Sequence, residues 1–406
     1  MVKRAVRYVK NFDLNLWILS LGWFVSAMGF AVSIPFISIY FHAELGMSML
    51  DIGLFFSIMA IVRAAFQAIG GEIADRMERR YLLIHSQWIR SIAFGLMAVS
   101  IYMDLGFWAI AVSFFINSIF GSIMQPVANA MVSDILPKEK RLDGYAITRS
   151  AGNLGWAVGP AIGGFLAVFS YGFLFVVSGI VILISSFVFW RFLKSPPTTI
   201  INQRFKFKDL AAIKDDKFLA WHCILIFSLY LVVAQLIAPF SVYAVEMVKI
   251  SEHQLGVLYT LNGLLVVALQ IPLTKLISKW RFTMQLAMGS FIYVIGYGMV
   301  GFFSSFYFFI IAMTVVTFGE MAMSPPSLAL TSKLAPEGRM GRYMGIFGFF
   351  VALGWSFGPL YGGAILDGFG DHHLTAWLLI SSLAFVSGAG YLYFTRILPH
   401  EFNYKD

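Results

Sequence analysis

The chain has 406 residues, of which 59% are hydrophobic and 12% are charged, and its mean hydropathy is +0.79. Soluble domains carry about 25% charged residues, so this composition excludes an ordinary soluble protein. Apolar runs of about 20 residues or more, long enough to cross a bilayer, recur along the whole chain. The composition therefore predicts a protein embedded in a lipid bilayer.

The apolar runs predict twelve membrane-spanning helices in two sets of six. The expected fold is an all-α membrane protein with an N-terminal six-helix bundle at 1–194, a cytoplasmic linker at 195–216 and a C-terminal six-helix bundle at 217–406. The linker contains Pro196 and Pro197, which end a helix, and basic residues that are costly in lipid. The expected spans are 14–41, 50–71, 81–102, 107–135, 143–168, 172–194, 217–245, 252–277, 282–303, 306–333, 342–366 and 374–397.

Basic residues set the expected orientation, because positive residues near spans are retained in the cytoplasm. With the N-terminus inside, the termini, the linker and the even-numbered loops hold almost all lysines and arginines outside the spans. Loops on the other side carry acids such as Glu44, Asp104 and Asp367. We therefore expect a plasma-membrane protein with both termini in the cytoplasm. The net charge of +8 then reflects topology and gives no reason to expect a nucleic-acid partner.

Few charged residues fall inside the expected spans, and each is costly there unless it faces a cavity or a partner. Arg63 lies 12 residues before Asp75, about 18 Å into the membrane at 1.5 Å per residue, with Gln67 one turn later. Arg149 lies two turns into the fifth span, with Asn153 one turn on. We expect these side chains to line a cavity. Arg90 in the third span has two alternatives, the cavity or the cytoplasmic interface, which a long side chain can reach.

The loop after the second span reads G-E-I-A-D-R-M-E-R-R from Gly71 to Arg80. Asp75 lies at the C-terminal end of this span, where the helix dipole disfavours a carboxylate unless a partner compensates. Arg76, Arg79, Arg80 or the N-terminus of another helix could supply that compensation. The alternative is that the basic residues only anchor the loop on the cytoplasmic side.

A repeat links the two halves of the chain: 154–164 returns as 353–363 at an offset of 199 residues, from Pro160 to Pro359. Glycines one turn apart share a helix face and let a neighbouring backbone approach closely, and a proline permits a bend. An internal repeat in a membrane protein is typical of secondary transporters, whose substrate binds between the repeats. The expected packing residues are Gly155, Gly159, Pro160, Gly163, Gly354, Gly358, Pro359 and Gly362.

Glu320 is the one acid expected deep within a span, about 20 Å from the cytoplasmic end of 306–333. A carboxyl group in such a place can carry a titrating proton or contact substrate. The alternative is a permanent hydrogen bond that ties spans ten and seven together. No metal-ligand spacing, nucleotide loop or nucleophile motif occurs, and Cys223 is the single cysteine. We therefore expect no enzymatic activity, no cofactor and no metal.

The twelve spans, the loop 71–80, the basic linker and the paired glycine motifs together resemble the major facilitator superfamily. The loop is similar to the family signature G-x-L-a-D-R-x-G-R-R, with Glu78 in place of the usual glycine. By this resemblance, Asp75 caps the start of span eleven near Gly345 when the transporter faces outward, and Asp134 pairs with the arginines. The motif G-x-x-x-G-P-x-x-G-G in span five resembles the marker of the drug/proton antiporter branch, which is associated with export.

Two positions depart from this exporter pattern. The first-span motif has an acid nine residues before its proline, whereas this chain has Ser26 before Pro35. The fourth-span motif has an arginine four residues before its glycine, whereas this chain has Asn117 before Gly121. Both departures move the expected proton coupling onto Glu320 or leave transport uncoupled. Asn117 stays a candidate cavity residue.

The resulting hypothesis is a monomeric transporter that works by alternating access and exports hydrophobic or amphipathic small molecules in exchange for protons, as multidrug efflux antiporters do. One alternative is uptake or facilitated transport of an organic anion or lipid-like solute through Arg63 and Arg149. The other is a membrane receptor or scaffold that transports nothing.

Overall fold

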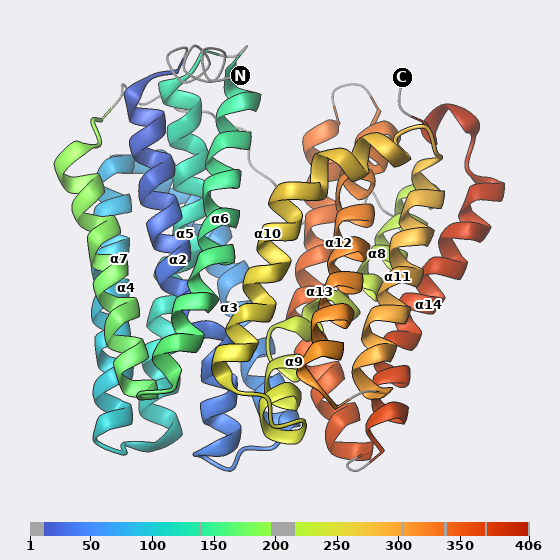
Figure 1. The fold of residues 1–406 in the computed structure, drawn as a ribbon. Helices are drawn as coiled ribbons and strands as arrows, with labels where there is room; N and C mark the ends of the chain where they lie inside the picture. The colour runs from blue at the N-terminus through green and yellow to red at the C-terminus, as the bar shows by residue number, and fades with distance from the viewer. Residues whose placement is uncertain are drawn as a thin grey trace. The chain divides into compact units, whose positions relative to one another are not determined.

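The computed structural model describes residues 12–137, 140–195, 216–302, 304–336, 339–369 and 372–404, and for 68–76, 142 and 340–341 it describes the backbone alone. The regular structure in these residues is entirely helical (Figure 1). The first half contains α2 (Leu14–Ala43), α3 (Met49–Arg76), α4 (Arg79–Tyr102), α5 (Gly106–Ile135), α6 (Arg141–Ala167) and α7 (Tyr171–Phe192). The second half contains α8 (Lys217–Val233), η3 (Ala234–Leu236), α9 (Pro239–Val242), η4 (Tyr243–Met247), α10 (Glu252–Ile277), α11 (Phe282–Phe302), α12 (Phe306–Leu334), α13 (Met340–Phe369), α14 (His373–Ile397) and η5 (His400–Phe402).

Eleven helical segments in the described part of the chain are long and apolar enough to cross a membrane. Helix α6 is long enough but less apolar than these segments, because its glycines and Asn153 lower its mean hydropathy. Large apolar side chains cover the outside of the helices, and Trp108, Leu276 and Tyr307 are each more than 75% exposed. Such a surface requires an apolar solvent. The chain is a multi-pass membrane protein, and the predicted all-α fold is confirmed.

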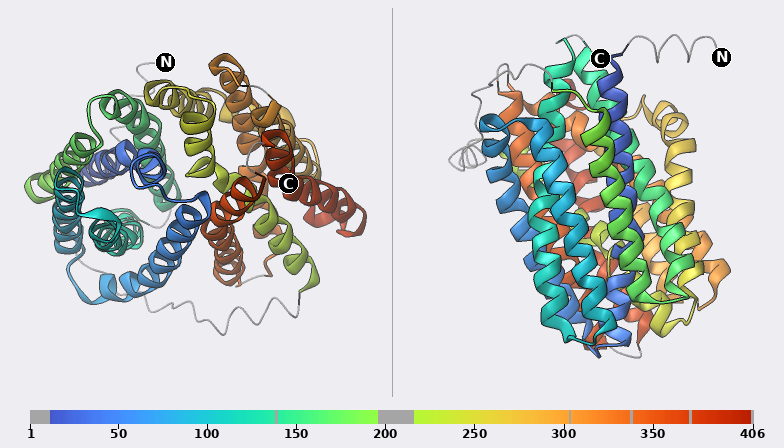
Figure 2. Two further views of the ribbon diagram at one scale, coloured as in Figure 1. Left: turned by 90° about the horizontal axis from the view of Figure 1, so that it is seen from below. Right: turned by 90° about the vertical axis from the view of Figure 1, so that its left-hand side faces the viewer.

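Contacts group the residues into two compact units that interleave along the sequence. The first unit comprises residues 1–40, 61–202 and 255–263, and the second comprises residues 41–60, 203–254 and 264–406. Each unit has one helix packed between two others. In the first unit α4 lies between α5 and α7 (Figure 2), and in the second α11 lies between α12 and α14. The same helices of the two sequence repeats therefore pack in the same way.

The span predicted over 217–245 corresponds to one apolar segment, Lys217–Met247, but the helix within it is interrupted. Helix α8 begins at Lys217, and the carboxylate of the preceding Asp216 accepts hydrogen bonds from the N–H groups of Phe218 and Leu219 at 2.9 and 3.1 Å. It ends at Val233, before a 3₁₀ turn and a short helix that starts at Pro239. Proline has no N–H to donate to the carbonyl four residues earlier, so the regular ladder stops there.

The side chain of Gln235 links this break to α13. The Gln235 amide donates to the carbonyl of Leu231 at 2.6 Å and to the carbonyl of Gly358 in α13 at 2.8 Å. Because Gln235 is fully buried, these bonds satisfy carbonyls that no water reaches. The break in the first helix is therefore joined directly to the glycine motif of α13.

Candidate functional site: a pocket with two arginines

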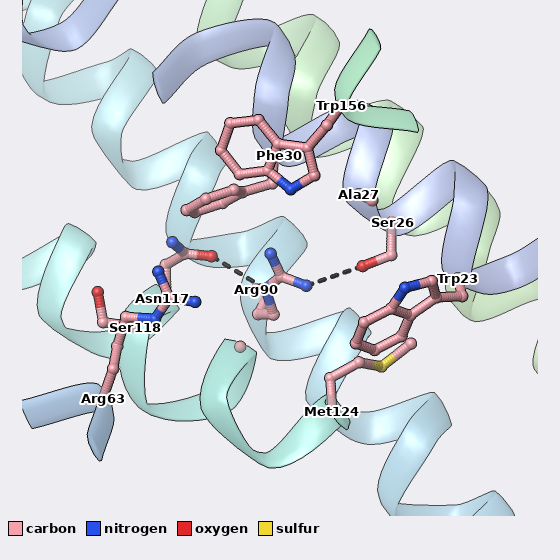
Figure 3. Close-up of a pocket in the computed structure, with 11 residues that line it drawn as sticks. Trp23, Ser26, Ala27, Phe30, Arg63, Arg90, Asn117, Ser118, Met124 and Trp156 are labelled. Atoms are coloured by element: carbon pink, nitrogen blue, oxygen red, sulfur yellow. Dashed lines mark hydrogen bonds between the residues drawn. The ribbon is translucent and has the colours of Figure 1, made fainter. Parts of the chain in front are cut away.

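The first unit contains a pocket of about 100 Å³ that five of its helices line (Figure 3). Helix α2 contributes residues at helical spacing, from Trp23 to Phe30, and α5 contributes residues from Asn117 to Met124. Residues three, four and seven apart lie on one helix face, so these stretches present one side to the pocket. We call this site the guanidinium pocket, and it is lined by Trp23, Ser26, Ala27, Phe30, Arg63, Arg90, Asn117, Ser118, Gly121, Met124 and Trp156.

Arg90 lies at the centre of the guanidinium pocket and is only 5% exposed. Its Nε donates to the Asn117 Oδ1 at 3.0 Å, and its Nη1 donates to the Ser26 Oγ at 2.9 Å and the Gln87 Oε1 at 3.0 Å. Gly121 leaves room for it, because a Cβ at that position would lie 3.3 Å from the Arg90 Nε. Of the two alternatives for Arg90, the structure shows the cavity and not the interface.

Arg63 reaches the same pocket from α3 and stays exposed. The guanidinium carbons of Arg63 and Arg90 lie 5.7 and 5.6 Å from the centre of the Phe30 ring. Each cation is attracted by the ring, while the two positive charges repel each other. Phe30 also packs edge-on against Trp156, with ring centres 5.8 Å apart. Among the residues that the structure describes, the pocket lining therefore combines aromatic walls with two cations and no carboxylate.

Of the five predicted coupling or substrate residues in the first unit, Arg63 and Asn117 line the pocket. Gln67, Arg149 and Asn153 have exposed side chains in the first unit but do not line the pocket. Glu320 belongs to the second unit, where it is half-buried at the middle of α12, 14 residues from either helix end (320 − 306 and 334 − 320). It lies within electrostatic range of Tyr293 in α11.

The structure describes in part the predicted conformational latch, which consists of Gly71, Asp75, Arg76, Arg79, Arg80 and Asp134. Arg79 at the start of α4 forms an ion pair with Asp134 at the end of α5, and both side chains are buried. Arg79 also donates to the carbonyl of Ala130 at 2.8 Å, and Arg80 donates to the carbonyl of Trp190 at 2.6 Å. The side chains of Gly71, Asp75 and Arg76 lie outside the described residues. The latch through Asp75 therefore stays a prediction.

The glycines of both repeat motifs lie where helices approach closely. A Cβ added at Gly155 or Gly159 would lie 2.8 Å from a backbone atom of Met28 in α2. A Cβ added at Gly354 or Gly358 would lie 3.1 and 2.9 Å from the backbone oxygens of Phe227 and Leu231 in α8. Each motif thus packs on the first helix of its own unit. Gly163 likewise meets Val32 and Phe36 of α2, and Gly362 meets Gln235 of η3. The carbonyls of Pro160 and Pro359 instead lie against Gly256 in α10 and Gly53 in α3.

Sequence reasoning did not place Arg90, Phe30 and the tryptophans together, although one signal pointed there. The two departures from the exporter pattern, Ser26 and Asn117, both accept hydrogen bonds from Arg90. Two missing motif residues together with one additional intramembrane arginine indicate that the charge has moved to another helix. No group of three or more His, Cys, Asp or Glu side chains in the described part of the chain could hold a metal ion.

The chain matches the model of the Major Facilitator Superfamily over residues 19–359 and again over 232–403. It is 28% identical to an uncharacterized MFS-type transporter, YttB, of Bacillus subtilis, over 90% of this chain and 91% of that protein. It is 24% identical to a Na(+), Li(+), K(+)/H(+) antiporter of Planococcus maritimus (95% and 96% covered) and 25% identical to the multidrug resistance protein MdtH of Proteus mirabilis (97% and 96%).

Its fold is similar to the crystal structure of a POT family transporter in complex with a thioalcohol-conjugated peptide, with a TM-score of 0.80 at 13% identity over 94% of this chain and 96% of that one. At this identity the likeness concerns the fold alone. The chain belongs to the Major Facilitator Superfamily, and the predicted family is confirmed. It is a membrane transporter and not an enzyme.

Proposed function

We propose that this protein is a secondary active transporter that exports amphipathic small molecules in exchange for protons. The observation that carries the proposal is the guanidinium pocket, because its aromatic walls suit an apolar body and its two cations suit a polar head. Ligand sites that accept such molecules are mostly apolar, with a few placed polar groups. The names of two relatives, a multidrug resistance protein and a cation/proton antiporter, support the same class of activity.

The proposed proton site is Glu320. Glu320 is the one acidic residue of α12. It lies at the middle of the helix and is half-buried in a segment that crosses the membrane. A carboxyl group in such a place is kept only where it faces a cavity or a partner. Alternation would then follow the family pattern, in which the two halves move around the bound substrate. The proposed setting is the plasma membrane, with both termini in the cytoplasm.

Reconstitution into liposomes that contain a pH-sensitive dye tests this function. The probes are a panel of lipophilic cations, anions and zwitterions, each added with and without a proton gradient. We expect at least one amphipathic probe to move protons in the direction opposite to its own flux. Flux without proton movement would reduce the protein to a facilitator, and no flux with any probe would contradict transport of this substrate class.

A further inference from the structure

We infer that the guanidinium pocket is a binding subsite for amphipathic organic monoanions, whose carboxylate or sulfonate enters between Arg63 and Arg90. The inference deepens the proposed function, on which it rests for the role of the ligand as a substrate. The substrate would then carry a negative charge, and the guanidinium pocket would bind its head group while other parts of the transport path contact the rest of the molecule.

The first reason is uncompensated positive charge. Arg63 makes no hydrogen bond or ion pair with any described residue, and Arg90 is hydrogen-bonded only to neutral side chains. Both guanidinium groups lie over the ring of Phe30, and their positive charges repel each other. Like charges near an apolar wall are costly, and an anion placed between them converts the repulsion into two attractions.

The second reason is a set of hydrogen-bond donors without acceptors. The Nε and Nη1 of Arg90 are used, but its Nη2 makes no hydrogen bond among the described residues. The Asn117 Nδ2 and the Ser118 Oγ are buried and have no partner there either. In Figure 3, Asn117, Ser118 and Arg63 lie on one side of Arg90. Buried donors without acceptors are rare, and the oxygens of a carboxylate or sulfonate are the acceptors that would satisfy them.

The third reason is the rigidity of this arrangement. Ser26, Gln87 and Asn117 accept three hydrogen bonds from Arg90, and all three are at most 3% exposed. These acceptors come from α2, α4 and α5, so they fix the guanidinium plane from three sides. A donor that is held before the ligand arrives loses little conformational freedom on binding. Arg63, which is exposed, is free to close on the anion from α3.

The size and the walls of the pocket select the body of the ligand. A volume of about 100 Å³ is below the roughly 300 Å³ at which pockets enclose a whole drug-sized molecule, so the site holds a head group and the first ring or chain segment attached to it. Trp23, Phe30, Trp156 and Met124 provide apolar contact. An inorganic anion would leave this contact unused, and a cation would be repelled by both arginines.

Equilibrium dialysis of the purified full-length protein tests the subsite without requiring transport. The probe is radiolabelled naphthalene-2-carboxylate, and the competitors are naphthalene-2-carboxamide, 2-naphthylmethylammonium and sodium sulfate. We expect saturable binding that the neutral amide and the ammonium compound displace at least about tenfold less well than unlabelled carboxylate does, because each loses charge-assisted hydrogen bonds. Sulfate that competes as well as the carboxylate would overturn the amphipathic ligand class.

Two conservative variants and one control locate the site. Arg63→Gln should weaken binding by about 10- to 100-fold, and Ser118→Ala by a few-fold, since neither side chain holds the fold together. Arg191→Gln is the matched control: it removes an exposed arginine of the same unit, at the end of α7, and should leave the affinity unchanged. Equal loss in Arg63→Gln and Arg191→Gln would overturn the assignment, because it would indicate a general effect of charge.

The outcomes also separate this inference from the proposed function. Proton-coupled flux of lipophilic cations, with no carboxylate binding, would overturn the subsite and leave the transport function intact. Carboxylate binding that depends on Arg63, with no flux of any probe in liposomes, would support the subsite and contradict the transport function.

Discussion

The two halves of this transporter share their packing and differ in their polar centres. Gly159 and Gly358, at matching positions of the repeat, both lie against the first helix of their own unit. Between α2, α4 and α5, however, the first unit holds a buried arginine, whereas the second holds a carboxyl group in α12 and a buried histidine in α8. Duplication thus preserved the contacts between backbones, while the charges diverged.

The divergence is clearest in two buried side chains, one in each unit. His222 in α8 is fully buried and hydrogen-bonded to Ser327, Thr331 and Tyr391 at 3.0 to 3.1 Å, so its hydrogen-bonding capacity is used within the fold. Arg90 leaves one nitrogen without a partner among the described residues and shares its pocket with a second cation. A saturated polar network fixes a structure, and an unsaturated one can bind a ligand.

The largest expected effect tests the shared packing. Gly159→Leu and Gly358→Leu should each destabilise the protein by about 3 kcal/mol or more, because a large side chain cannot fit where backbones touch. Thermal unfolding and size-exclusion profiles in detergent measure this. Gly348→Leu is the control in α13, since a Cβ there meets nothing within 4 Å. Damage in only one of the two motif variants would break the equivalence of the halves.

The second prediction tests the difference in polar chemistry. Glu320→Gln should abolish proton-driven accumulation, because the amide keeps the shape of the side chain but carries no titrating proton. Substrate counterflow in liposomes, which needs no proton gradient, should survive. Wild-type uphill transport by this variant would remove Glu320 as the proton site, and loss of substrate binding would recast it as a ligand-contacting residue.

The third prediction concerns the ion pair between Arg79 and Asp134, which joins α4 to α5 in the first unit. Asp134→Asn should cost about 3 kcal/mol of folding free energy, because it removes the carboxylate that pairs with a buried guanidinium. Glu246→Gln is the control: it removes a pair whose Lys249 side chain is 72% exposed, and should cost less than about 0.5 kcal/mol. Thermal melts measure both values. Equal decreases in melting temperature would show that burial of the ion pair does not affect its contribution to stability.

The smallest expected effect compares how two equivalent helices begin. The carboxylate of Asp367 accepts the N–H groups of Met49 and Leu50 at 3.0 and 2.7 Å and so caps α3 from far along the chain. Helix α10 is capped locally, by the reciprocal bonds between Ser251 and Gln254. Asp367→Asn and Ser251→Ala should each cost about 1 kcal/mol in thermal melts.

The two caps are expected to differ in one further property. Asp367→Asn alone should increase cysteine labelling at the first turn of α3, because only that cap depends on tertiary contact. The probe is a single cysteine introduced at Leu50 after replacement of Cys223, which is buried. Unchanged labelling would show that the long-range cap does not hold α3 in place.

The sequence by itself determined the spans, the repeat and the family. Apolar runs and glycine spacing are local patterns, and each implies a helix or a close helix contact wherever the chain goes. The capping box of Ser251 and Gln254 is local in the same sense, because its partners are three residues apart. Pro239 was also visible in the sequence, but the hydrogen bond from Gln235 beside the break to the carbonyl of Gly358 was not, because its two residues are far apart along the chain.

Only the tertiary structure decided which polar groups meet. Arg90 finds Ser26 and Asn117 on two other helices, and Asp367 reaches the N-terminus of α3 across more than 300 residues. Arg63 and Arg149 were both expected to line a cavity because of their depth within a span, yet of the two only Arg63 lines the pocket. Depth follows from counting residues along one helix, whereas the partner of a side chain depends on the rotation of that helix and on the neighbours packed against it.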